Sequence, residues 1–358
     1  MKKVCFVISG SGYSGAEVVL NRYLENNILI DKYFIIIFKN NEVENKLIEL
    51  YGREKVFSLN LHYNKNLFKF LIPIYINKVK KGLRRTILKI NPELIYVNNT
   101  FEGILSSKYI KSSEFKSILH IHDMRQCYTH PYNNYVIGKY FKYYTKILTV
   151  SESTRESWKP LNMEVIYNGL SPEYFRNKNF KSSINNIGFV GSLNKRKGAD
   201  IFINSLNYIL EKTNLEIFIA FKDYEKNIKN MLYEYKSNSR VHIMENINEM
   251  EIMDLYNKID LLIVPSRLDP LPTVIMEAQA RGVLVLGNNS SGIPEMIPID
   301  ELVININSKT ELCDKINNII NLDRCIYKQY SKTVFDYTIR NFKSEYKQKK
   351  INMIINKL

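Results

Sequence analysis

Two carboxylates that lie eight positions apart, Asp269 and Glu277, are the strongest candidates for chemistry in this chain of 358 residues. The apolar run Leu261 to Val264 just before them is typical of a strand that is buried on both faces. Proline suits the first position of a helix, so we expect a helix from Pro272 to Arg281. The pattern therefore places one carboxylate on a loop and the other on a helix, both directly after one buried strand.

Unpaired backbone N–H groups at the start of a helix bind phosphate. In the predicted helix these groups belong to Thr273 and Val274, and Glu277 lies one turn after Thr273 on the same face. Leu271 stands between two prolines, which have no N–H, so its amide is the loop donor available to a ligand hydroxyl. This segment predicts a site for a diphosphate joined to a ribose.

The stretch from Asp269 to Glu295 reads acid, seven residues, Glu, then Gly-x-Pro-Glu, and resembles the pattern of retaining GT-B glycosyltransferases of family 4. The resemblance implies that Glu277 holds the nucleotide ribose and that Asp269 meets hydroxyls of the donor sugar. It also implies that the amides of Thr273 and Val274 meet the diphosphate. The family usually has Glu where Asp269 stands, so the shorter carboxylate must reach a nearer hydroxyl or a differently turned sugar. The alternative is that both acids cap or pair with neighbouring elements.

A second match lies after the strand predicted over residues 186–190, where a basic loop leads into a helix. In the family the Lys of a Lys-Gly pair neutralises the donor diphosphate, which implies this role for Lys197. The family usually has an Arg where Ser192 stands, and Arg196 or Lys195 is the nearest replacement. The alternative, a solvated basic turn, is disfavoured because cations oppose the helix dipole there unless an anion binds.

The segment Gly10 to Gly15 reads G-x-G-x-x-G between a predicted strand, Lys3 to Ile8, and a predicted helix, Ala16 to Leu29. A dinucleotide site also needs an acidic residue after the second strand, but the strand predicted over Tyr33 to Phe38 runs into Lys and Asn. An NAD(P)-dependent oxidoreductase is therefore an alternative for which the glycine pattern is present and the acidic residue is absent. In the glycosyltransferase family this loop, which ends at Gly15 here, closes over donor phosphate or acceptor. An ordinary strand-to-helix turn is the other interpretation.

His120 and His122 follow the apolar run 117–119, and in an extended strand their side chains point to the same face. The family often carries a His at this strand end that contacts the donor sugar, and His122 before Asp123 is the better match. A hydrogen-bonded structural histidine is the alternative. No D-x-D motif and no motif for further metal ligands occur in the chain. We therefore expect no metal ion and no cofactor besides the nucleotide-sugar co-substrate.

Apolar strands alternate with helical stretches along the whole chain, which favours parallel sheets covered by helices. The length suggests two domains. The resemblance implies the GT-B architecture, in which two doubly wound, Rossmann-like α/β domains face each other across a cleft. We expect residues 1–170 to form an acceptor-side domain and residues 171–335 a nucleotide-sugar-binding domain. A C-terminal helix over 336–358 should cross back to the first domain.

The chain carries 51 Lys and Arg against 36 Asp and Glu, and part of its net charge of +15 is concentrated in residues 62–89. This segment contains eight basic residues and no acidic ones. A helix there would have one apolar stripe and one basic face, formed by Ile76, Val79, Leu83 and Ile87 and by Lys78, Lys81 and Arg85 respectively. Such a helix suits an anionic membrane surface, although the same pattern fits a core-packed helix with a solvated face. No nucleic-acid-binding motif accompanies the charge, so no nucleic-acid partner is expected.

The four cysteines show no C-x-x-C spacing, which fits a reducing compartment without a disulfide framework or zinc site. No apolar run is long enough for the core of a signal peptide or for a membrane span. We therefore expect a cytoplasmic protein that is either soluble or bound peripherally to the inner face of the plasma membrane.

Together the motifs predict a retaining, metal-independent glycosyltransferase that moves a sugar from a nucleotide-diphosphate sugar to a glycan or lipid-linked saccharide. Capsule or lipopolysaccharide synthesis in a bacterium is the pathway we expect. Besides the oxidoreductase, a second alternative is a non-catalytic nucleotide-sugar-binding protein, which would keep Glu277 and Lys197 but transfer nothing.

Overall fold

The computed structural model describes residues 1–10, 15–25, 27–62, 68–127, 140–159, 161–175 and 180–358. The chain forms two compact units. Unit 1 comprises Met1–Gly169 and Ser344–Leu358, and unit 2 comprises Leu170–Lys343. Our predicted boundaries fell one residue later at the first crossing, and the return to unit 1 begins at 344 instead of 336.

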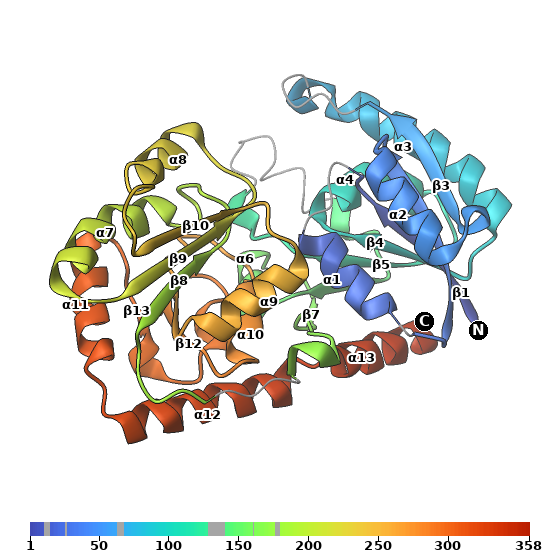
Figure 1. Cartoon of the computed structure of the whole chain (residues 1–358). Helices are drawn as coiled ribbons and strands as arrows, with labels where there is room; N and C mark the ends of the chain where they lie inside the picture. Colours follow the sequence, from blue (N-terminus) through green and yellow to red (C-terminus); the bar gives the residue numbers. More distant parts are fainter. Residues whose placement is uncertain (11–14, 26, 63–67, 128–139, 160, 176–179) are drawn as a thin grey trace. The chain divides into compact units, whose positions relative to one another are not determined.

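Unit 1 is built on a seven-stranded parallel sheet with the order β3-β2-β1-β4-β5-β6-β7 (Figure 1). Its strands are β1 (Lys2–Ile8), β2 (Ile30–Phe38), β3 (Val56–Leu61), β4 (Leu94–Asn98), β5 (Lys116–Ile121), β6 (Lys146–Thr149) and β7 (Glu164–Val165). Its described helices are α1 (Gly15–Leu24), α2 (Asn41–Tyr51), α3 (Phe68–Ile90), α4 (Thr100–Lys111), α6 (Glu152–Ser157) and α13 (Ser344–Lys357). Because all strands run in parallel, their carboxyl ends lie at one edge of the sheet, where polar side chains from different strands can meet.

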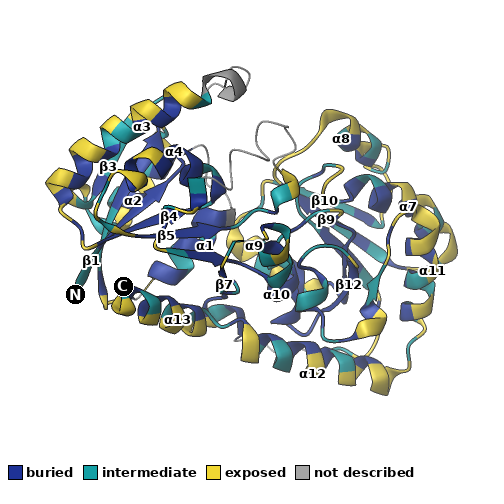
Figure 2. Cartoon of the chain, turned by 180° about the vertical axis from the view of Figure 1, so that it is seen from behind, coloured by how far each residue is buried: buried dark blue, intermediate teal, exposed yellow. Residues whose placement is uncertain are grey.

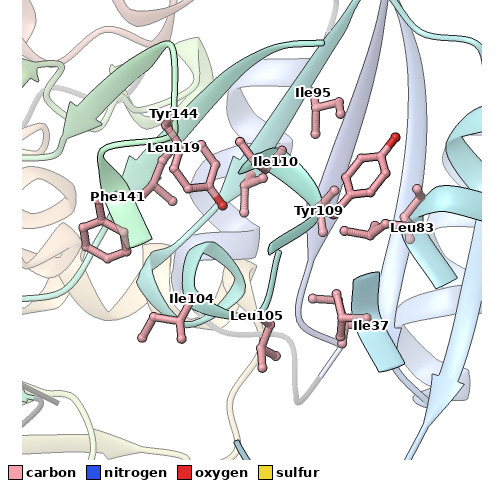
Figure 3. Close-up of a cluster of buried hydrophobic side chains, with 14 of the residues drawn as sticks. Ile37, Leu83, Ile95, Ile104, Leu105, Tyr109, Ile110, Leu119, Phe141 and Tyr144 are labelled. Atoms are coloured by element: carbon pink, nitrogen blue, oxygen red, sulfur yellow. The ribbon is translucent and has the colours of Figure 1, made fainter. Parts of the chain in front are cut away.

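Each face of this sheet has its own hydrophobic core. On one face, Ile37 of β2, Ile95 of β4 and Leu119 of β5 pack with side chains of α3 and α4 (Figure 3). On the other face, Phe6, Phe34 and neighbouring strand residues pack with α1, α2 and α13. The near-continuous apolar strands thus reflect a sheet that is covered on both sides.

Helix α1 ends at Leu24, five residues before the predicted end. Beyond this end, the Leu29 N–H donates to the side chain of Asn27 at 3.2 Å. Asn27 in turn donates to Asn352 of α13 at 3.0 Å. The predicted helix is therefore five residues too long, and the contact of Asn27 with α13 is one that helical periodicity does not reveal.

Helix α3 has the two faces that the sequence predicts. Its apolar stripe is buried in the core of unit 1, whereas most of its described basic residues are exposed, and Figure 2 shows both classes of position along the helix. The buried residues are Ile76, Val79, Leu83 and Ile87, and the exposed ones include Lys78, Lys81, Arg84, Arg85 and Lys89. The apolar stripe is therefore occupied by the protein core and does not face a membrane.

Unit 2 contains a six-stranded parallel sheet with the order β10-β9-β8-β11-β12-β13. Its strands are β8 (Asn186–Val190), β9 (Glu216–Phe221), β10 (Val241–Glu245), β11 (Leu261–Val264), β12 (Leu284–Asn288) and β13 (Val303–Ile304). Its described helices are α7 (Ala199–Lys212), α8 (Lys226–Tyr233), α9 (Glu249–Lys258), α10 (Thr273–Gln279), α11 (Lys309–Ile320) and α12 (Arg324–Asn341). The order reverses between β8 and β11, which is the point where open α/β sheets bind ligands.

The C-terminal segment is two helices, not the single helix predicted over 336–358. Helix α12 ends at Asn341, and α13 begins at Ser344. Between them Phe342 is buried, and its carbonyl accepts from the Leu170 N–H at 2.7 Å. Helix α13 then packs on α1 of unit 1, where the Tyr23 hydroxyl donates to Asn352 at 3.0 Å. The predicted return of the last helix to the first domain is confirmed, but the chain turns first.

Candidate functional site

The candidate site in unit 2 lies at the carboxyl ends of β8 and β11, which are hydrogen-bonded neighbours. The loop 191–198 follows β8, and the loop 265–272 follows β11. These two loops carry half of the predicted site residues, and α10, which follows the second loop, carries three more. The switch in strand order therefore brings together two motifs that are about 70 residues apart in sequence.

Gly198 lets the two loops touch. It has a φ of +70°, and a Cβ at this position would lie 2.1 Å from the carbonyl oxygen of Pro265. Only glycine combines this conformation with such a close approach. Gly191, at φ +151°, leaves space instead, since a Cβ there would meet nothing within 4 Å. The loop after β8 is thus close to its neighbour at one end and open at the other.

Lys197 and Asp269 are brought together as an ion pair between Nζ and Oδ2. The Asp269 side chain is buried, and Lys197 is partly exposed. The Asp269 carbonyl also accepts from the Gly292 N–H at 3.1 Å, and the Lys197 N–H donates to Asn194 Oδ1 at 2.9 Å. The carboxylate of Asp269, although shorter than the usual Glu, therefore reaches Lys197, the residue predicted to bind the diphosphate. The ion pair holds the Lys197 side chain in position.

Arg196 forms hydrogen bonds to the loop 265–272. Its Nη1 donates to the Leu268 carbonyl at 3.1 Å, and its own carbonyl accepts from the Arg267 N–H at 2.8 Å. Arg267 forms two hydrogen bonds to Asp200, of 2.7 and 2.9 Å. Ser192, partly buried, stands two residues after the end of β8. Arg196 thus supports the position of Asp269 by holding the residue before it.

Glu277 lies in α10 with a relative exposure of 7%. The Tyr256 hydroxyl, from α9, donates to Glu277 Oε2 at 3.1 Å. This bond holds the carboxylate in place inside the domain. Sequence reasoning missed Tyr256, because the only local signal is an apolar position in a helix, and the partner is 21 residues away.

Helix α10 begins at Thr273 rather than at Pro272, which is the N-cap with an extended ψ of 113°. Pro272 has no side chain that can cap the helix. Thr273 and Val274 are the first two helical residues, and N–H groups at these positions have no carbonyl partner within the helix. Leu271, the residue with the predicted loop amide, is buried. The helix start thus presents two backbone amides, four and five residues after Asp269 in the chain.

The remaining predicted residues, Gly15 and His122, belong to unit 1. Gly15 is the first residue of α1, and residues 11–14 of the glycine-rich loop lie outside the described residues. His122 follows β5, and its Nε2 lies 3.1 Å from Asn98 Oδ1 at the end of β4. Its ring lies 4.4 Å from the His120 ring, centroid to centroid. Both histidines share one face, as the strand periodicity predicts.

Several buried titratable groups of unit 1 have shifted pKa values. Burial lowers the pKa of His120 and of His122 well below its usual range, so both rings are neutral near pH 7. Burial lowers the pKa of Lys347, in α13, to about 7. Burial and the charge of Glu17 raise the pKa of Glu102, in the first turn of α4, well above its usual range. Within the described residues, no group of three or more His, Cys, Asp or Glu is arranged to hold a metal ion.

Comparison with known protein families agrees with the resemblance that the sequence motifs indicate. Residues 171–333 match the family described as glycosyl transferases group 1. Unit 2 is therefore similar to a glycosyl transferases group 1 domain. The matched range contains both loops of the site, and it spans nearly all of the unit.

Several relatives are named as glycosyltransferases. An uncharacterised glycosyltransferase of Haemophilus influenzae is 24% identical, with 83% of this chain and 84% of that protein covered. The capsular polysaccharide biosynthesis glycosyltransferase CapH of Staphylococcus aureus is 23% identical, with 81% and 82% covered. An uncharacterised glycosyltransferase of Methanocaldococcus jannaschii is 29% identical, but the match covers only 42% of this chain and 44% of that protein.

Solved structures agree with the whole fold. The Anabaena protein HepE, crystallised with UDP and glucose, matches with a TM-score of 0.80 and 16% identity over all of both chains. Sucrose-phosphate synthase of Thermosynechococcus elongatus matches with a TM-score of 0.81 and 13% identity, over 100% of this chain and 99% of that one. The predicted GT-B fold is confirmed.

Proposed function

We propose that this protein is a retaining, metal-independent glycosyltransferase whose donor is a nucleotide-diphosphate sugar. The acceptor is a glycan or a lipid-linked saccharide. The observation that carries the proposal is the ion pair between Lys197 and the buried Asp269 at the switch point of unit 2. The loop of Asp269 leads directly into α10, which carries two helix-start amides and the buried Glu277. This set offers one group for each part of such a donor.

The cation and the amides suit the diphosphate. Lys197 supplies a positive charge, and Thr273 and Val274 supply N–H donors at the start of a helix. As the bond between the anomeric carbon and the phosphate oxygen breaks, negative charge grows on the diphosphate, and these fixed groups stabilise it. They take the role that a divalent cation has in metal-dependent enzymes of this kind.

The carboxylates suit the hydroxyl-bearing parts of the donor. Glu277, held by Tyr256, accepts hydrogen bonds from the ribose, and Asp269 accepts them from the sugar. In the transfer step the acceptor oxygen bonds to the anomeric carbon on the face from which the diphosphate leaves. The acceptor's proton passes to an oxygen of the leaving phosphate, so that the configuration of the sugar is retained and atoms balance.

The relatives suggest the acceptor class. CapH is named for capsular polysaccharide synthesis, and a further relative is the O-antigen chain mannosyltransferase RfbU of Salmonella typhimurium, 24% identical over 62% of this chain. HepE was crystallised with UDP and glucose. These names support a bacterial surface polysaccharide as the product and a nucleoside diphosphate as the leaving group.

A cytoplasmic site at the inner face of the plasma membrane fits a lipid-linked acceptor. None of the described helices is long and apolar enough to cross a membrane. The exposed basic face of α3 offers attraction to anionic lipid. Because the apolar stripe of α3 is in the core, the contact that we propose is electrostatic.

Calorimetric titration tests the donor site. Purified protein is titrated with UDP, GDP, ADP and NADPH, each in EDTA. Tight binding of one nucleoside diphosphate is expected, and binding of NADPH alone would restore the oxidoreductase alternative. In Glu277→Gln the affinity for that diphosphate should fall roughly ten- to a hundred-fold, because a charge-assisted hydrogen bond contributes about 1.5–3 kcal/mol. Unchanged affinity would remove Glu277 from the site.

A second assay separates an enzyme from a non-catalytic binding protein. The protein is incubated with the matching nucleotide sugar and membrane extract, and release of the nucleoside diphosphate is measured. Release that depends on the extract and is lost in Lys197→Met supports transfer. Tight binding without release, across all donors tested, would favour the binding protein.

A further inference from the structure

Asn98 makes two hydrogen bonds that join three segments of unit 1. It is the last residue of β4 and has a relative exposure of 1%. Its Nδ2 donates to the carbonyl oxygen of Ala16, in the first turn of α1, at 3.3 Å. Its Oδ1 lies 3.1 Å from Nε2 of His122, just after β5. A single side chain therefore connects the helix that follows the glycine-rich segment to the candidate catalytic histidine.

These two contacts fix the orientation of the amide. A backbone carbonyl can only accept, so the NH₂ group of Asn98 must face Ala16. The amide oxygen then faces His122, and an oxygen without a hydrogen can only accept. The Nε2 atom of His122 must therefore carry the hydrogen.

We infer that Asn98 is a positioning residue, which holds His122 in the Nε2–H tautomer so that Nδ1 presents a lone pair to a hydroxyl of the substrate. The tautomer follows from the contacts of Asn98. The sugar hydroxyl as its target rests on the proposed function. Asn98 thus acts through His122 and needs no contact with the substrate.

The surroundings of His122 keep its ring neutral, as an acceptor nitrogen requires. The His120 ring packs against it, and the Tyr96 hydroxyl lies 2.6 Å from His120 Nδ1. Burial is the main cause that lowers the pKa of His122, followed by the positive charge of Lys347. The groups that act on His122 are therefore basic or uncharged, and they oppose the imidazolium form.

The tautomer can be observed directly by NMR of the full chain labelled with ¹⁵N-histidine. The chain has five histidines, so the spectrum is simple, and His122→Gln assigns the signal. Correlation of the ring nitrogens with the ring protons should show His122 with a protonated Nε2 and a bare Nδ1. A protonated Nδ1 in the wild-type protein would overturn the inference.

Two variants separate positioning from folding. Asn98→Leu keeps much of the volume but cannot accept, so the signal of His122 should shift toward a mixture of tautomers. Asn98→Asp keeps an acceptor, so the Nε2–H tautomer should persist while the carboxylate raises the pKa of His122. The signal of His242, which lies on β10 of unit 2, serves as the control and should not move. An unchanged His122 signal in Asn98→Leu would overturn the inference.

Sugar transfer provides the second readout. We expect Asn98→Leu to lower kcat at least tenfold, and Asn98→Asp to keep more activity but to lose it at a higher pH than the wild-type protein as the solution is acidified. Equal losses in both variants with an unmoved pH profile would reduce Asn98 to a structural role. If the wild-type protein shows the predicted tautomer but transfers no sugar from any donor, the proposed function fails while the tautomer assignment stands.

Discussion

At the scale of single residues, Gly198 controls how closely the two loops of unit 2 approach each other. The Ala variant would place Cβ 2.1 Å from the Pro265 carbonyl oxygen, at a φ of +70° that side chains rarely adopt. We expect Gly198→Ala to lower the free energy of unfolding by more than about 1 kcal/mol, and to weaken nucleotide binding because Lys197 moves with the loop. Urea unfolding and calorimetry measure the two effects.

Gly191→Ala is the matched control for that variant. Gly191 also has a positive φ, of +151°, but a Cβ there would meet nothing within 4 Å. The control therefore shares the backbone strain and lacks the clash, so its loss of stability should be smaller. If the two variants unfold at the same urea concentration, the close approach of Gly198 to Pro265 does not limit the fold.

The residues of the site differ in how well the sequence predicts them. Lys197 and Asp269 stand in motifs, so their part in a site could be predicted, but not that the shorter acid would pair with the lysine. Tyr256 and Asn98 could not be predicted, because each acts through a side-chain hydrogen bond to an element distant in sequence. Local patterns record which face is buried, but not which partner a buried hydroxyl or amide finds.

At the scale of elements, α3 shows how one helix divides its sequence between core and solvent. Leu83 is fully buried in the core of unit 1, while Leu88 on the same helix is 71% exposed. We expect Leu83→Ala to cost about 2–5 kcal/mol of unfolding free energy, because it leaves a cavity. The matched variant Leu88→Ala should stay within about 0.5 kcal/mol of the wild-type protein.

Tryptophan fluorescence during urea unfolding measures the stability difference between these two variants, because it reports on unit 1, which contains the mutated helix. Trp158 is the one tryptophan of the chain, and it lies in the same hydrophobic core as Leu83. Its ring is 5.4 Å from that of Phe141, and its Nε1 donates to the Asp123 carbonyl at 2.9 Å. A Leu83→Ala transition that coincides with the wild-type one would contradict the packing described for α3.

The elements themselves were predicted best where the local pattern has a single interpretation. Strands β8 and β11 begin and end where the sequence predicts, because each is a short apolar run closed by Gly or Pro. The ends of α1 and the division between α12 and α13 were missed. Tertiary hydrogen bonds lie at both places, made by Asn27 and by the Phe342 carbonyl, and periodicity reveals neither of them.

At the scale of the whole molecule, Lys347 ties the end of the chain to the core of unit 1 and makes its stability depend on pH. It is buried, lies 3.4 Å from Asn168 Oδ1 and has a pKa lowered to about 7. The unfolded chain, with a lysine pKa near 10.4, binds more protons between these values. The contribution of Lys347 to unfolding free energy therefore rises from pH 7 to about 10.

Chemical unfolding from pH 7 to 9.5 tests this contribution by comparing variants. Burial raises the pKa of the Cys5 thiol, which acts in the opposite direction above about pH 8.5, so the difference from the wild-type protein is the informative quantity. Lys347→Met should be more stable than the wild-type protein at pH 7, and the gap should narrow as pH rises. The exposed control Lys349→Met should show a small, constant difference. A constant gap for Lys347→Met would mean that Lys347 is not held below its usual pKa.

The net charge of +15 is a property of the whole chain, but its exposed concentration on α3 predicts where an anionic membrane would bind. Since the apolar stripe is in the core, attraction should be electrostatic, at about 1 kcal/mol for each Lys or Arg near the lipid. It should therefore weaken as salt is added. We expect co-sedimentation with anionic vesicles, little with neutral ones, and loss of binding in the triple variant Lys78→Glu, Lys81→Glu and Arg85→Glu.

A second triple variant tests whether vesicle binding depends on the location of the basic residues or on the net charge of the protein. Lys309→Glu, Arg324→Glu and Lys328→Glu change three exposed basic residues of unit 2, so the net charge falls by the same amount as in the α3 variant. This control should still sediment with anionic vesicles, because the basic face of α3 is intact. Equal losses in both variants would show that net charge alone attracts the lipid, whereas equal recovery of the wild-type protein with neutral and anionic vesicles would remove the membrane from the proposal.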